Sequence, residues 1–192
     1  NEGIAIDKPV HVSGLCASKV LLTGSVEVVS EEKSRVDEAG IAVVDTAEVT
    51  ISGLGVLSPL AGVAVVNSQD VVLGDLEVVG SAGIGVYVAG GSDGLLDRIW
   101  VHDTVEGAGP GQKGQGLWVE DGAKITVAES VIEKVHLAGA YARKQGTSLT
   151  IMDTVVRDVS KGGLYDGLGV SVEVNAAVVL ERVVLEGNRG AG

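Results

Sequence analysis

Gly116-Leu-Trp-Val-Glu-Asp-Gly-Ala-Lys-Ile-Thr-Val-Ala-Glu-Ser-Val-Ile132 is the stretch that decides the fold, because the same pattern recurs before and after it. The pattern has an anchor glycine, apolar residues at +1 and +3, a polar turn, an apolar triplet that ends at +11, and small or apolar residues at +14 and +16. Such recurrence at intervals of roughly 20 to 50 residues indicates a repeat architecture. The six anchors are Gly40, Gly62, Gly85, Gly116, Gly139 and Gly169, and a seventh copy begins at Gly190.

The spacing inside the repeat is almost constant, whereas its total length varies. The triplet ends 11 residues after the anchor in five copies and 12 residues after it in the Gly139 copy. Length changes fall between +16 and the next anchor, where 4 to 14 residues intervene. Three short strands per repeat, each stacked on its counterpart in the next repeat, would give this pattern. The sequence therefore predicts an all-β parallel solenoid of about seven coils, with three short parallel sheets and variable loops at one corner.

This pattern resembles that of the right-handed parallel β-helix proteins of the pectate-lyase-like superfamily. The resemblance covers about 150 residues and implies a right-handed helix, because repeats of variable length do not suit the strict hexapeptide of left-handed forms. It also implies an exported bacterial protein at the cell surface or outside the cell. We expect one domain over residues 1–192, with a first coil and a charged loop over 3–39 and regular coils over 40–192. We further expect it to be part of a longer protein.

Composition limits the classes of partner. The net charge of −12 opposes binding to nucleic acid or to an anionic membrane, and no apolar run is long enough to cross a membrane. One cysteine, Cys16, excludes an internal disulfide, and its apolar neighbours predict a buried thiol. An open end of a solenoid exposes a strand edge, so end-to-end or lateral self-association is also an expectation.

Three aromatic residues share the +2 offset in adjacent copies. Tyr87, Trp118 and Tyr141 follow Ala42 and Ala64 in this column. A +2 residue lies between two inward-facing residues, so its side chain points out of the coil. One interpretation is an exposed platform on which sugar rings stack. The alternative is that the rings pack on one another or are covered by a loop.

Both long corner loops lead into strands beside this column. The residues that could bind a ligand there are His102 and Asp103 in the first loop, and Arg157, Asp158 and Tyr165 in the second. Loops of a regular scaffold often carry function. The alternative is that the loops are plain insertions and that His102 is a solvated corner residue.

Charged residues with partly alternating sign occupy the +13 offset. The structural interpretation is a set of ion pairs between coils. The enzymatic interpretation assigns Asp97, Arg98, Glu129 and Asp153 to lyase chemistry, with a base that removes a proton and acids that hold Ca²⁺. Gly90-Gly-Ser-Asp-Gly94 is a second, weak calcium candidate. Otherwise no cofactor is expected.

The sequence thus favours a non-catalytic scaffold or binding module that recognises a glycan or a protein partner through its aromatic face and corner loops. Two alternatives stay open. One is a polysaccharide lyase or glycoside hydrolase, and the other is a rigid spacer of a surface protein.

Overall fold

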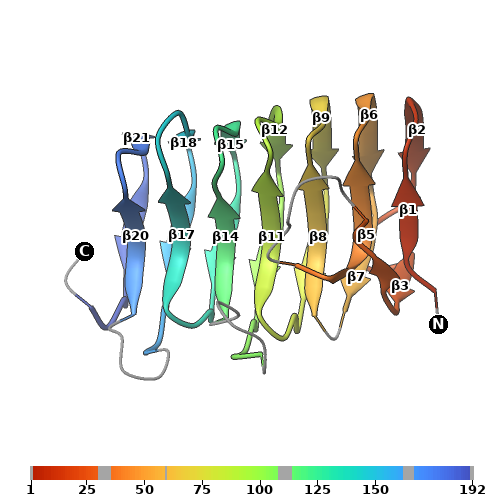
Figure 1. The fold of residues 1–192 in the computed structure, drawn as a ribbon. Helices are drawn as coiled ribbons and strands as arrows, with labels where there is room; N and C mark the ends of the chain where they lie inside the picture. Colours follow the sequence, from red (N-terminus) through yellow and green to blue (C-terminus); the bar gives the residue numbers. More distant parts are fainter. Residues whose placement is uncertain (1, 30–35, 59, 108–113, 162–166, 191–192) are drawn as a thin grey trace.

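The chain folds as a parallel β-helix in which each coil adds one strand to each of three sheets. The structure is a computed structural model that describes residues 2–29, 36–58, 60–107, 114–161 and 167–190. Within these ranges it contains 22 strands and no helix. The coils stand side by side in a single row, and the two termini lie at opposite ends of it (Figure 1).

The three sheets, called A, B and C here, run along the row of coils. Sheet A contains β1 (Ile4–Ile6), β4 (Val26–Glu27), β5 (Glu38–Val44), β8 (Ala61–Val66), β11 (Ile84–Ala89), β14 (Gln115–Val119), β17 (Ala138–Arg143) and β20 (Leu168–Glu173). Sheet B contains β2 (Val10–Ser13), β6 (Ala47–Ser52), β9 (Gln69–Gly74), β12 (Asp93–Asp97), β15 (Lys124–Ala128), β18 (Ser148–Met152) and β21 (Ala177–Glu181). Sheet C contains β3 (Leu21–Thr23), β7 (Gly55–Leu57), β10 (Glu77–Val79), β13 (Trp100–His102), β16 (Val131–Glu133), β19 (Val155–Arg157) and β22 (Val184–Glu186).

The predicted register is confirmed at the +1, +2, +3, +11 and +16 offsets. The +2 residues pair in sequence order, including Tyr87 with Trp118 and Trp118 with Tyr141. The triplet ends also pair, and Val127 meets Ile151 despite the extra residue in the Gly139 copy. The first coil follows the same rule, since Ile4 pairs with Ile41. Only β4 deviates, because it pairs antiparallel with β5.

The anchor must be glycine because successive coils approach too closely there for a side chain. A Cβ atom added at Gly116 would lie 2.4 Å from Cγ2 of Ile132 and 2.6 Å from the carbonyl oxygen of Gly139. The equivalent distances at Gly85 are 2.4 Å to Cγ1 of Val101 and 2.5 Å to the Gly116 oxygen. The glycine column therefore lets sheet A pass next to the β-branched side chains of sheet C.

Left-handed backbone at single residues turns the chain from one sheet to the next. The +13 residues Asp75, Arg98, Glu129, Asp153 and Arg182 all have φ between 48° and 53°. Such a conformation costs about 1 kcal/mol for a residue with a Cβ atom. The cost is tolerated because each turn is held by hydrogen bonds to the neighbouring coil, such as the one that Arg98 N donates to Ala128 O.

The inside of the helix is filled by aliphatic columns, and a second apolar cluster lies on the outer face of sheet A. Val56, Val78 and Val101 form one inner column and are fully buried. The outer cluster contains Val28 and Val36 packed with residues of sheet A. At the C-terminal end of the described chain, Leu185 of the same column is 39% exposed and Leu180 of a sheet B column is 44% exposed, because no described coil covers them.

In the part of the chain that the structure describes, no helix is long and apolar enough to span a membrane.

Candidate functional site

The predicted aromatic column exists, but two of its three rings are not accessible. The ring centroids of Tyr87 and Trp118 are 6.4 Å apart, and those of Trp118 and Tyr141 are 5.0 Å apart, both in edge-to-face geometry. Tyr87 is 0% exposed and Trp118 is 3% exposed, whereas Tyr141 is partly buried. The expectation of an exposed platform was therefore wrong for Tyr87 and Trp118. The alternative, rings that pack on one another under cover, describes the column.

Polar contacts fix the phenol groups of this column. The Tyr87 hydroxyl donates to Oε1 of Glu120 at 3.0 Å, and Glu120 is fully buried. Nζ of Lys144 lies 3.5 Å from the other carboxylate oxygen of Glu120. The Tyr141 hydroxyl donates to Oε2 of Glu173 at 2.6 Å, and burial together with this carboxylate raises the pKa of Tyr141. These contacts give the column a structural role.

An accessible aromatic residue lies instead on the outer face of sheet C. Trp100 is at offset +15 of its copy, and it pairs with Glu77 of β10 and Val131 of β16. Its side chain is 41% exposed. The indole Nε1 donates to Oε1 of Glu133 at 3.0 Å, which fixes the ring on the sheet.

His102 supports Trp100 from one side. The two rings stack with centroids 4.0 Å apart and planes 25° apart. His102 is only 7% exposed, so the expectation of a solvated corner histidine was wrong. Nδ1 of His102 lies 2.7 Å from Oδ2 of Asp103, and Nε2 lies 3.2 Å from Oε1 of Glu77. Because His102 covers one face of Trp100, the exposed area belongs to the opposite face and the edges.

Glu133 and Arg157 continue this row toward the C-terminal coils. Glu133 is 5% exposed, and Nε and Nη2 of Arg157 both lie 2.6 Å from its Oε2. Burial alone would raise the pKa of the Glu133 carboxyl, but hydrogen bonds from Arg157 and Trp100 outweigh it, so the pKa is lowered. A charged carboxylate is thus maintained under the indole.

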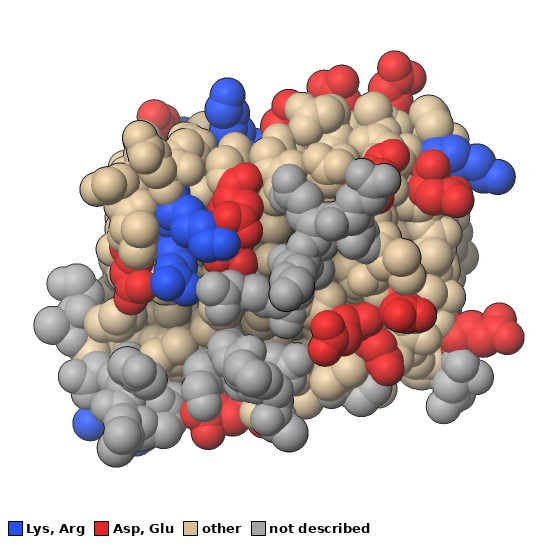
Figure 2. Space-filling view, viewed as in Figure 1, with Lys and Arg blue, Asp and Glu red and all other residues tan. Residues whose placement is uncertain are grey.

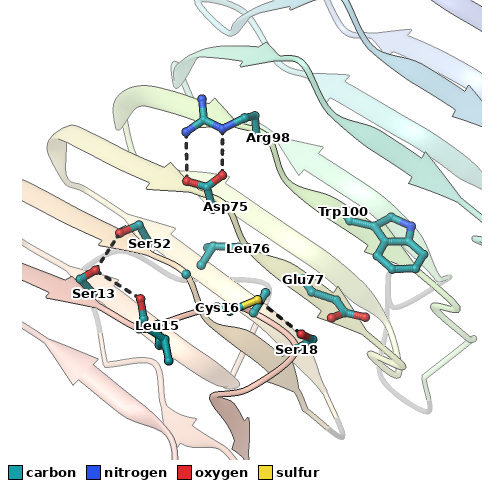
Figure 3. Close-up of a pocket in the computed structure, with 13 residues that line it drawn as sticks. Ser13, Leu15, Cys16, Ser18, Ser52, Asp75, Leu76, Glu77, Arg98 and Trp100 are labelled. Carbon is teal, nitrogen blue, oxygen red and sulfur yellow. Dashed lines mark hydrogen bonds and ion pairs between the residues drawn. The ribbon is translucent and has the colours of Figure 1, made fainter.

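Trp100 closes one end of a groove of about 640 Å³ between the first coil and sheet C. The segment Gly14–Ser18 forms the opposite wall. Figure 3 shows Glu77 and Trp100 on neighbouring strands, and both line the groove together with the segment that carries Cys16 and Ser18. Leu15 is 89% exposed on this wall, and Cys16 is exposed too, so the expectation of a buried thiol was wrong.

The lining of the groove includes one of the ion pairs expected at the +13 offset. Nε and Nη2 of Arg98 donate to the two carboxylate oxygens of Asp75 at 2.8 and 3.0 Å. Arg98 also contacts the Asp97 carboxylate. The hydrogen bond from Arg98 lowers the pKa of Asp75. Arg182 and Asp153 form an equivalent pair at 2.5 and 2.7 Å, so pairing between coils is confirmed for these four residues.

The other predicted site residues have structural positions. Asp103 and Asp158 lie just after β13 and β19 with φ of 55°, where they turn the chain at the third corner. His102 and Arg157 end these strands and are not loop residues. Tyr165 lies outside the described residues. In the glycine-rich calcium candidate of residues 90–94, Oδ1 of Asp93 accepts a hydrogen bond from the backbone amide of Asp70 at 2.7 Å. Among described residues no group of three metal-binding side chains was found.

Sequence reasoning missed Trp100 and the groove, although a signal for Trp100 was present. The residue lies between the inward-facing Ile99 and Val101, so period-two alternation directs it outward. A tryptophan at an outward position of a short strand, followed by His102 two residues later on the same face, is the pattern that should have been singled out. Nothing in the sequence indicated that Gly14–Ser18 would lie opposite to it.

Comparison with protein-family models agrees with the architecture. A family model described as a right-handed β-helix region matches residues 39–192. Among solved structures, the alginate lyase from Paenibacillus sp. str. FPU-7 is similar, with a TM-score of 0.44 and 12% sequence identity over 92% of this chain and 84% of that one. Comparison with curated protein sequences gives no significant match.

The fold and the family match together define a repeat protein of the parallel β-helix class. The chain belongs to the right-handed β-helix family.

Proposed function

We propose that this chain is a non-catalytic binding module that recognises a saccharide through the groove beside Trp100. The observation that carries the proposal is the half-exposed indole at the end of a groove, with its other face fixed by His102. An aromatic face suits the C–H surface of a sugar ring. Because the ring is already fixed by His102 and Glu133, little side-chain entropy is lost on binding. Export to the cell surface, which the resemblance implies, is part of this proposal.

The groove also offers the polar groups that orient a sugar. Glu77 and the hydroxyl of Ser18 lie along it, and carboxylates and hydroxyls are common partners of sugar hydroxyls. The rungs of sheet C are about 4.8 Å apart, which is close to the length of one pyranose unit. Successive sugars could therefore lie along the row that Trp100 shares with Glu77 and Val131.

The charges near the groove favour binding over a lyase reaction. Arg98, which the enzymatic interpretation would use, is already paired with Asp75 and Asp97, and these two carboxylates oppose the approach of a uronate carboxylate. A lyase also needs a base that is accessible to substrate. His102 is almost fully buried beneath Trp100.

The test is a glycan array followed by calorimetry with the hits. Trp100→Ala should weaken saccharide binding at least tenfold, which corresponds to about 1.4 kcal/mol. Tyr141→Ala, which changes a partly exposed aromatic residue of sheet A, is the matched control and should bind as the wild type does. Equal binding by Trp100→Ala would contradict the proposal, and absence of any saccharide ligand would favour the rigid spacer.

A further inference from the structure

The groove has an excess of negative charge close to Trp100. Its described lining contains two carboxylates, Asp75 and Glu77, and one guanidinium, that of Arg98. Arg98 is bound by both oxygens of Asp75 and also contacts Asp97, so its single positive charge already faces two carboxylates other than Glu77. The negative charge of the groove that Arg98 does not offset is therefore that of the Glu77 carboxylate.

His102 does not neutralise Glu77 when its ring is neutral. A neutral imidazole has one N–H group. Nδ1 of His102 lies 2.7 Å from the Asp103 carboxylate, and Nε2 lies 3.2 Å from that of Glu77. Two carboxylates contact this one ring, so the imidazole, charged or neutral, leaves at least one negative charge uncompensated. The side chain of Glu77 is 26% exposed, which allows a ligand to reach it.

Resting on the proposed function, we infer that the groove selects saccharides that carry a protonated amine. A cation over the indole face of Trp100 is attracted by the ring quadrupole. Glu77 and Trp100 both line the groove, so a saccharide that lies on the indole can bring its ammonium group to the Glu77 carboxylate. A uronate would place its carboxylate against Glu77 and would be repelled.

The experiment compares three hexasaccharides with one backbone by calorimetry at neutral pH. They are β-1,4-linked glucose, the same chain with 6-amino groups, and the N-acetylated form of that amine. Wild type should bind the amine at least fivefold more tightly than the acetylated form. Added salt should reduce this preference, because an exposed charge pair is screened.

Glu77→Gln keeps the shape of the side chain and removes its charge, so the preference for the amine should disappear. Glu181→Gln is the control, since it changes the net charge equally but lies on β21, far from the groove along the row of coils. Circular dichroism checks that both variants fold. Equal binding of amine and amide by wild type, or a preference that survives in Glu77→Gln, would overturn the inference.

The two proposals fail in different ways. If Trp100→Ala loses binding of all three saccharides but none of them is preferred, the proposed function stands and the selection for amines is wrong. If wild type binds no saccharide of either charge, both are wrong.

Discussion

At the scale of single residues, Glu133 connects the candidate site to the stability of the fold. It is nearly buried, it accepts the indole N–H of Trp100, and it pairs with Arg157. Hydrogen bonds to a charged group contribute about 1.5 to 3 kcal/mol. The charge of Glu133 therefore stabilises the fold only while Arg157 lies beside it.

The first prediction concerns the pH dependence of this contribution. The pKa of Glu133 is lowered on folding, so its stabilisation is complete above the unfolded pKa of about 4.3. It is lost as pH falls through the lower folded value. Glu133→Gln should reduce the free energy of unfolding by about 1 to 3 kcal/mol at pH 7, and thermal melts should show this gap closing in acid. A gap that is the same at pH 7 and in acid would contradict the assignment.

The second prediction concerns His102 as a positioning residue for Trp100. His102→Ala removes the stacked ring, so the indole should move more freely while the fold is kept. Its fluorescence should become more sensitive to quenching, and saccharide affinity should fall. His102→Phe keeps a ring in contact with the indole and should restore most of the affinity. Failure of His102→Phe to restore it would indicate that the imidazole acts by its charge or hydrogen bonds.

The residue scale also shows why the candidate site was only partly predicted. Arg157 is partly exposed, whereas His102 is buried, and both residues end strands and are not loop residues. Trp118 was predicted to be exposed because alternation along the strand points its side chain out of the coil. Alternation does not show whether another segment covers an outward side chain. Whether an outward side chain is covered depends on contacts between distant segments, such as those of Val28 and Val36 with sheet A.

At the scale of elements, the apolar composition of the sheet A strands indicates that their outer face is covered. Ala61-Gly-Val-Ala-Val-Val66 contains no polar side chain, and all of β8 is buried. Strands that are buried on both faces read as continuous apolar runs rather than alternating ones. The strands of sheet B, such as β15, do alternate and do have an exposed outer face. The difference was readable in the sequence.

The third prediction tests why the anchors are glycines. Gly116→Ala would put a Cβ atom 2.4 Å from Ile132 and 2.6 Å from a backbone oxygen. Overpacking of this kind costs about 1 to 3 kcal/mol or more, and denaturant titration should measure that loss. Gly74→Ala is the matched control. Its added Cβ would meet nothing closer than 3.8 Å, so the free energy of unfolding should stay level or rise slightly. Equal effects at both positions would refute the close-approach explanation.

At the scale of the whole molecule, the fold was almost fully predictable because a solenoid converts spacing along the chain into neighbourhood in space. The constant offsets predict that Val101 lies beside Ile132 and that Val127 lies beside Ile151, and both pairs are found. The antiparallel β4 was not predicted, since it belongs to no repeat. Charges of opposite sign also lie close together: many basic side chains lie beside acidic ones on the face drawn in Figure 2.

The fourth prediction concerns local stability along the row of coils. Each coil is stabilised by its neighbours, so coils with one neighbour should open more readily than central ones. In β21 four of five residues are exposed, whereas β11 is buried throughout. Hydrogen exchange should therefore be faster over β20–β22 than over β8–β14. Uniform protection along the chain would contradict this account.

The most direct test of the central claim uses the two tryptophans of the chain. Each gives one indole N–H signal in an ¹⁵N NMR spectrum, and Trp100→Phe identifies which signal belongs to Trp100. On titration with the glucose hexasaccharide or its 6-amino counterpart, the Trp100 signal should shift while that of Trp118 stays in place. A shift of the Trp118 signal alone, or binding that moves neither signal, would contradict the assignment of the site to sheet C.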